Sequence, residues 1–142
     1  MDRNPAFESG GAGLVSTIND YSRFASVLMN EGSLEGVQIL RPPTVKYLAS
    51  RTLTTIQQKS FDLRLTQCGH SYGNLMRVMT DCSKAGDLGS LGEYGWAGWL
   101  GAGFCNCPKD DLTFLFMMQK TGTVMTVLTR KLRNIILRSC CS

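Results

Sequence analysis

The clearest hydrophobic pattern near the start of the chain predicts an amphipathic helix from residue 17 to residue 29. Thr17 can cap its first turn, and Asp20 completes a pair like a capping box. Asn30-Glu31-Gly32 ends the pattern, with Gly32 as the expected C-cap. The apolar side chains that recur at helical spacing are Ile18, Tyr21, Phe24, Ala25, Leu28 and Met29.

Beyond this helix the pattern predicts shorter elements. A turn-rich connector with a β-like end at residues 37–40 precedes a short helix over residues 43–50, where prolines are tolerated in the first turn. Residues 51–70 are polar and weakly patterned and predict a loop. Residues 72–80 predict a strand, and the glycine-rich residues 83–92 predict a flexible loop.

The last third of the chain has the strongest strand signal. Lys109-Asp110-Asp111 is typical of a hairpin turn after the aromatic and small residues of 94–107. Residues 112–119 predict a buried strand, and residues 123–138 return to helical spacing. Helices precede and follow a strand and a hairpin, so we expect an α+β fold with an antiparallel sheet and flanking helices.

Length and composition predict one domain of 142 residues with no membrane span, because no apolar run approaches 18 residues. The first residues have no apolar signal region. Six cysteines without such a region favour a reducing compartment, so we expect a cytoplasmic location.

Positive charge gathers at the end of the chain. No acidic residue follows Asp111, whereas Lys120, Arg130, Lys131, Arg133 and Arg138 do. A nucleic-acid surface would interleave aromatic residues with these bases, and none lies beyond Phe116. We therefore expect the solvated face of a terminal helix and no nucleic-acid partner.

The cysteine spacing predicts no metal site. Cys105 and Cys107 are two residues apart, Cys140 and Cys141 are adjacent, and zinc sites usually show C-x₂₋₄-C with a second matching pair. Residues two apart on a strand share a face, so Cys105 and Cys107 are expected to be buried or half-buried thiols. We expect no cofactor.

The stretch from Gly69 to Gly73 matches G-x-S-x-G, the nucleophile elbow of α/β-hydrolases. The elbow requires a helix after the serine, but the residues that follow Ser71 are strand-like. No histidine follows Ser71 either, since His70 is the single histidine. A serine without a base is a weak nucleophile, so an independent G-x-S-x-G esterase is disfavoured.

Tyr72-Gly73-Asn74 also matches Y-x-N, the second motif of serine β-lactamases and penicillin-binding proteins. That motif follows an S-x-x-K nucleophile. No serine or threonine in this chain has a lysine three residues on. The match is therefore interpreted as coincidental.

A resemblance starts at the first residues. The segment PAFESGGAGLVST followed by NDYSRF resembles a signature of the β-lactamase-related serine hydrolases, which include class C β-lactamases, esterases and DD-peptidases. LMNEGSLEGVQILRPPTVKYL is similar to the helix, loop and short helix that follow. GWAGWLGA resembles the family's third motif, and FCNCPKDDLTFLFMMQ resembles the next hairpin. The match is strong at residues 5–41 and 92–119 and weak between 51 and 70.

The resemblance implies a partial β-lactamase/transpeptidase-like fold. In this family S-x-x-K and Y-x-N precede the segment with which this chain begins. We therefore expect residues 1–142 to be the C-terminal portion of such a domain, inactive alone. Ester or amide substrates would then require an N-terminal portion, and uncovered surfaces predict self-association.

The resemblance also assigns roles around the third motif, which reads Trp96-Ala97-Gly98 here. The backbone N–H of Trp99 would be an oxyanion donor, and Trp96, Ala97 and Gly98 would contact substrate. Trp96 replaces a charged or hydroxyl-bearing residue, which favours neutral esters or amides. Ala97 departs from the Thr and Gly forms of the motif. The alternative is a non-enzymatic binding module derived from the fold.

Overall fold

The chain forms a five-stranded antiparallel sheet with helices on both faces. The computed structural model describes residues 14–86, 88–120 and 124–140. The strands lie in sequence order, β3-β4-β5-β6-β7. They are β3 (His70–Tyr72), β4 (Arg77–Met79), β5 (Tyr94–Ala97), β6 (Gly103–Cys107) and β7 (Leu112–Phe116). This arrangement confirms the expected α+β class with an antiparallel sheet.

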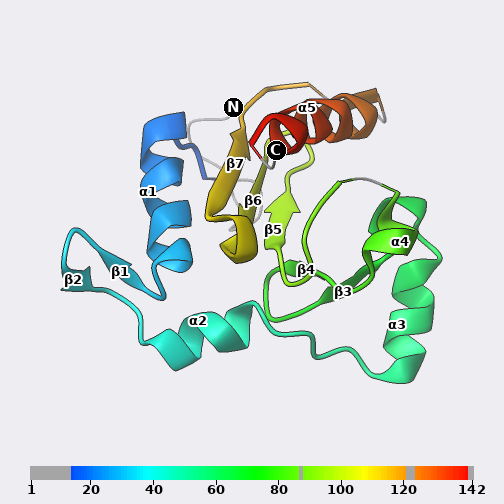
Figure 1. Cartoon of the computed structure of the whole chain (residues 1–142), viewed down its shortest axis with the longest axis horizontal. Helices are drawn as coiled ribbons and strands as arrows, with labels where there is room; N and C mark the ends of the chain where they lie inside the picture. Colours follow the sequence, from blue (N-terminus) through cyan, green and yellow to red (C-terminus); the bar gives the residue numbers. More distant parts are fainter. Residues whose placement is uncertain (1–13, 87, 121–123, 141–142) are drawn as a thin grey trace, which may run out of the picture.

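The helices and a small separate hairpin surround this sheet (Figure 1). The helices are α1 (Ile18–Met29), α2 (Pro42–Leu48), α3 (Thr55–Asp62), α4 (Cys82–Ala85) and α5 (Val124–Cys140), and the hairpin consists of β1 (Ser33–Leu34) and β2 (Val37–Gln38). α1 lies beside β7, whereas α3 and α4 flank β3 and β4. Among the described helices, none combines the length and the apolar character needed to cross a bilayer.

α1 begins as predicted after the Thr17 cap, but its C-cap is Asn30 rather than the expected Gly32. The Thr17 hydroxyl accepts a hydrogen bond from the Asp20 backbone N–H at 3.1 Å, which satisfies an amide in the first turn. Gly32 has φ +97° and donates to the Val27 carbonyl at 2.7 Å, so the chain reverses after the helix. The buried residues Ala25 and Leu28 lie on the face that contacts the sheet.

Residues 51–70 are not a loop, and that prediction is wrong. α3 begins with a capping box in which Thr54 and Gln57 exchange side-chain and backbone hydrogen bonds. None of its residues is buried, so it has no apolar stripe to reveal it. A short 3₁₀ helix, Leu65–Gln67, follows it.

The strand predicted over residues 72–80 is instead part of a hairpin. β3 and β4 pair antiparallel with Ser71 opposite Val78, and the Gly73 N–H donates to the Met76 carbonyl at 2.7 Å. Leu75 takes the left-handed conformation at φ +86° in this turn. Part of the predicted loop at 83–92 is likewise α4, capped by Asp81.

Two apolar clusters cover the two faces of the sheet. Successive side chains of a strand point to opposite faces, so Phe104 packs with α1 and Cys105 packs with α5. The first cluster also contains Val45, Met76, Val78 and Tyr94. The second consists of Cys105, Cys107, Phe114 and Leu137.

Two buried polar side chains fix the helices against these faces. Asn106 is fully buried, and its amide donates to the Ala25 carbonyl of α1 at 2.9 Å. Arg133 of α5 is also buried and pairs with Glu93. The expectation of a solvated basic face is therefore wrong for Arg133, because its charge is matched inside the fold.

Candidate active-site strand

The third-motif residues lie together at the end of β5. The strand stops at Ala97, and a tight turn follows in which the Gly98 N–H donates to the Ala102 carbonyl at 2.6 Å. Gly101 donates to the Gly98 carbonyl at 3.1 Å and has φ +86°. Trp99 is thus the second residue beyond a strand held on both sides by β4 and β6.

Trp99 is open to solvent in this turn. It is 89% exposed, and no acceptor in the described part of the chain receives a hydrogen bond from its backbone N–H. Ala97 and Gly98 are also exposed. A Cβ at Gly98 would come no closer than 3.7 Å to the Ala102 carbonyl, so internal packing does not require glycine there.

Trp96 belongs to a row of aromatic rings that sequence reasoning missed. Its ring meets Tyr72 edge to face at a centroid distance of 5.1 Å, and Tyr72 lies 6.2 Å from Phe61 of α3. Trp96 keeps 40% of its surface exposed. The row joins α3, β3 and β5. The sequence did not indicate this row of rings, because Phe61 falls in the segment predicted as a loop.

The G-x-S-x-G match is structural. Ser71 is 3% exposed in the middle of β3 and is followed by β4 rather than by a helix. A Cβ at Gly69 would lie 2.3 Å from the Asp81 carbonyl, and one at Gly73 would lie 2.0 Å from the Ser50 carbonyl. The two glycines permit close backbone packing, and the serine is not presented as a nucleophile.

His70 and Ser71 nevertheless line a pocket of about 430 Å³. It lies between α3, β3 and α4, and none of residues 96–99 borders it. Its other lining residues are Arg51, Leu53, Thr55, Gln58, Lys59, Asp62, Gly69, Thr80, Asp81 and Lys84. Sequence reasoning did not find this pocket, because α3 supplies much of its wall.

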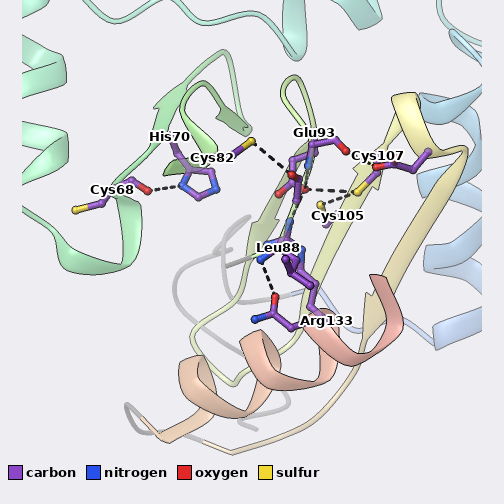
Figure 2. A network of polar contacts seen from close by, with 12 residues as sticks. Cys68, His70, Cys82, Leu88, Glu93, Cys105, Cys107 and Arg133 are labelled. Atoms are coloured by element: carbon purple, nitrogen blue, oxygen red, sulfur yellow. Dashed lines mark hydrogen bonds and ion pairs between the residues drawn. The ribbon is translucent and has the colours of Figure 1, made fainter. Parts of the chain in front are cut away.

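A second polar group lies beneath α5 (Figure 2). Cys105 and Cys107 are buried as predicted, with their Sγ atoms 3.7 Å apart. Cys107 Sγ lies 3.6 Å from Glu93 Oε2, which also contacts the Arg133 guanidinium. The hydrogen bond with Cys107 and burial together raise the pKa of the Cys105 thiol.

Comparison with known proteins identifies the family of this chain. The family model described as Beta-lactamase matches residues 1–137. Protein Rv1367c of Mycobacterium tuberculosis (strain ATCC 25618 / H37Rv) is 34% identical over 119 residues, which are 81% of this chain and 30% of that protein. Uncharacterized protein MT1414 of strain CDC 1551 / Oshkosh matches with the same figures. The chain thus spans about 30% of the length of these curated relatives.

Solved structures agree on the fold. Unliganded simvastatin synthase (LovD) from Aspergillus terreus superimposes with a TM-score of 0.68 at 16% identity, over 86% of this chain and 34% of that one. The LovD6 mutant gives the same TM-score at 15% identity, over 84% of this chain and 32% of that one. At such identity the likeness shows the fold alone. Because the family model covers nearly the whole chain, the protein belongs to the Beta-lactamase family.

Proposed function

We propose that this chain is the C-terminal portion of a β-lactamase-like serine hydrolase that cleaves esters or amides through an acyl-enzyme. It supplies the third-motif strand and is inactive without an N-terminal portion that carries S-x-x-K and Y-x-N. Family membership supports the reaction class. The buried state of Ser71 supports a nucleophile supplied from outside these residues.

The position of Trp99 carries the proposal. Trp99 is exposed and follows a strand whose end is fixed by the hydrogen bond between the Gly98 N–H and the Ala102 carbonyl. An amide held in this way needs no reorganisation when negative charge develops on a substrate carbonyl oxygen. Such a donor contributes roughly 2.7–4 kcal/mol to transition-state stabilisation. The second donor would be the N–H of the nucleophilic serine.

Trp96 supports a preference for neutral substrates. At the first position of the motif, Trp96 presents an indole instead of a cation or a hydroxyl, and its ring is part of the aromatic row. An indole offers one N–H donor and a large apolar surface, so it cannot pair with a carboxylate as lysine does. Ala97 and Gly98 form the exposed backbone beside it.

The test is reconstitution with the N-terminal portion that the proposal requires. The 142-residue chain is mixed or co-expressed with the unmatched part of Protein Rv1367c, and hydrolysis of a p-nitrophenyl ester is measured. Trp99→Pro removes the backbone donor, whereas Trp99→Ala removes the indole and keeps the N–H. We expect the proline variant to lower kcat by about 10²–10³-fold and the alanine variant to lower it far less.

The chain alone is then treated with a fluorophosphonate probe and its intact mass is measured. No adduct is expected, because Ser71 is buried without an elbow. An adduct that disappears in Ser71→Ala would contradict the proposal. A reconstituted pair that folds and binds the ester without hydrolysing it, and without being labelled, would favour a non-enzymatic binding module.

A further inference from the structure

The register of β5 and β6 brings three potential metal ligands together on the face under α5. Tyr94 pairs with Asn106, so the preceding residue, Glu93, lies opposite Cys107. Cys105 lies two residues from Cys107 on the same face of β6. Glu93, Cys105 and Cys107 are 2%, 6% and 1% exposed, and their ligand atoms all lie within 4.8 Å of one another.

Two of the three ligand distances match the edges of a tetrahedral zinc site. With Zn–S near 2.3 Å, two thiolates of a tetrahedron are about 3.8 Å apart, and with Zn–O near 2.1 Å a thiolate and a carboxylate oxygen are about 3.6 Å apart. The Cys105–Cys107 Sγ distance is 3.7 Å, and the Cys107 Sγ–Glu93 Oε2 distance is 3.6 Å. Figure 2 shows the three side chains converging beside α5.

We propose that Glu93, Cys105 and Cys107 form a binding site for Zn²⁺ beneath α5, with water in the fourth position. The site revises the expectation from cysteine spacing alone, because the third ligand comes from a neighbouring strand. Two thiolates and one carboxylate form a donor set that zinc favours. The site lies apart from Trp99 and does not depend on the proposed hydrolase reaction.

The charges of the cluster balance in both states. Without metal, the Glu93 carboxylate pairs with Arg133. Binding of Zn²⁺ replaces the two thiol protons, which leave to solvent, so the added charge of the ion is cancelled by two thiolates. Arg133 then remains hydrogen-bonded to the Glu93 carboxylate, so the charges of the ion, the two thiolates, the carboxylate and the guanidinium sum to zero.

Disulfide formation is not an equivalent outcome for this pair. Residues two apart on an extended strand have Cα atoms about 6.6 Å apart, near the upper end of the roughly 4.4–6.8 Å range that disulfides adopt. A metal ion can bridge the two sulfurs without moving the strand. The pair is therefore better suited to chelation than to oxidation.

The test is a Co²⁺ titration of the full, reduced chain, followed by displacement with Zn²⁺. Cys140→Ser and Cys141→Ser are introduced first, because that adjacent pair could bind metal independently. We expect one ion per chain, the visible and thiolate charge-transfer bands of tetrahedral cobalt, and two protons released per ion. Zn²⁺ should bleach the bands and raise Tm.

Matched cysteine variants locate the ligands. Cys105→Ala and Cys107→Ala should each weaken Co²⁺ binding by more than the 10–100-fold typical of a lost outer-sphere partner. Cys68→Ser and Cys82→Ser, at half-buried cysteines outside the cluster, should leave it unchanged. If the alanine variants do not fold, the cobalt absorption bands and the number of protons released by the parent chain decide whether the site exists. Absence of bands, or their loss in Cys68→Ser or Cys82→Ser, overturns the site.

Arg133→Met provides a second, independent test of the site. It removes the cation that otherwise neutralises Glu93, so a bound metal should become the main counter-ion. We expect Zn²⁺ to raise Tm more in this variant than in the parent chain. Folding that occurs only with Zn²⁺ would support the site equally. A variant that folds and gains no stability from Zn²⁺ would overturn it.

Discussion

Arg133 in α5 forms an ion pair with Glu93, the residue that immediately precedes β5, and the two side chains are only 6% and 2% exposed. The pair connects the terminal helix to the strand that carries the third motif. Ser90 also donates its backbone N–H to Glu93 Oε2 at 3.3 Å. The start of β5 is therefore fixed from the loop before it and from the helix above it.

Removal of one partner of this pair should be strongly destabilising. Arg133→Met leaves a buried carboxylate without its cation, and we expect a loss of roughly 3–5 kcal/mol in the free energy of unfolding in metal-free buffer. The double variant Arg133→Met, Glu93→Leu should lose much less than the sum of the two single changes. Urea denaturation measures the free energy of unfolding of the two single variants and of the double variant.

The exposed Arg23–Glu35 pair provides the control. Its side chains are 57% and 69% exposed, so Arg23→Met should cost at most about 1 kcal/mol. Equal losses from Arg133→Met and Arg23→Met would contradict the role assigned to the buried pair.

Gly69 and Gly36 allow backbone strain to be separated from steric conflict. Both have positive φ, at +77° and +82°. A Cβ at Gly36 would have no neighbour within 4 Å, whereas at Gly69 it would lie 2.3 Å from the Asp81 carbonyl and 2.6 Å from the Ala85 nitrogen. We expect Gly36→Ala to cost about 1–2 kcal/mol and Gly69→Ala clearly more, as measured by urea unfolding. Similar losses would argue against close packing of β3 on α4.

Elements with a buried face could be predicted from the sequence. α1 was predicted because its cap and its apolar stripe agree, β7 because its residues form an apolar run, and α5 because its apolar residues recur at helical spacing. α3 buries none of its residues, so hydrophobic periodicity cannot detect it. The Thr54-x-x-Gln57 capping pattern was its one local signal. The β3–β4 turn was missed because Leu75, rather than glycine, takes the positive φ there.

The sequence indicates candidate site residues only where they are neighbours along the chain. Residues 96–99 lie on one strand end, so a motif can indicate them. Charge counting placed Arg133 in solvent, since its partner is 40 residues away and becomes its neighbour only when α5 packs on the sheet. The Glu93–Cys107 contact likewise depends on strand register, which no spacing rule for cysteines contains.

The carboxyl group of Asp81 should give the protein a specific acid sensitivity. Hydrogen bonds from Ser83, and then Lys84, lower its pKa from 3.8 to about 2. Because the pKa is lower in the folded state, the stabilisation is complete above pH 3.8 and is lost as the pH falls toward about 2. An NMR titration of the carboxyl carbon measures the folded-state pKa directly.

Ser83→Ala is the matched variant for that titration. It removes the hydroxyl that donates to Asp81 Oδ1 at 2.6 Å and keeps the backbone donor. The pKa of Asp81 should therefore rise toward 3.8. An unchanged pKa in Ser83→Ala would show that the hydroxyl is not its main cause.

Self-association is the expected behaviour of the isolated chain. β7 is an edge strand, and no other strand pairs with its outer side in the described residues. The opposite edge is covered, because Gln58 of α3 donates to the His70 carbonyl of β3 at 2.8 Å. Near β7, α5 exposes Leu128 and Ile135, which lie two turns apart on one helix face.

Light scattering over a concentration series should show dimers or larger species. Ile135→Lys should shift the chain toward monomer, because it places a charge on the apolar face of α5. Ile56→Lys on α3 is the control, since Ile56 is 80% exposed and α3 covers the opposite edge of the sheet. A parent chain that remains monomeric at all concentrations, or equal effects of both lysines, would contradict association through β7 and α5. The N-terminal portion used in reconstitution should suppress association if it covers the same surface.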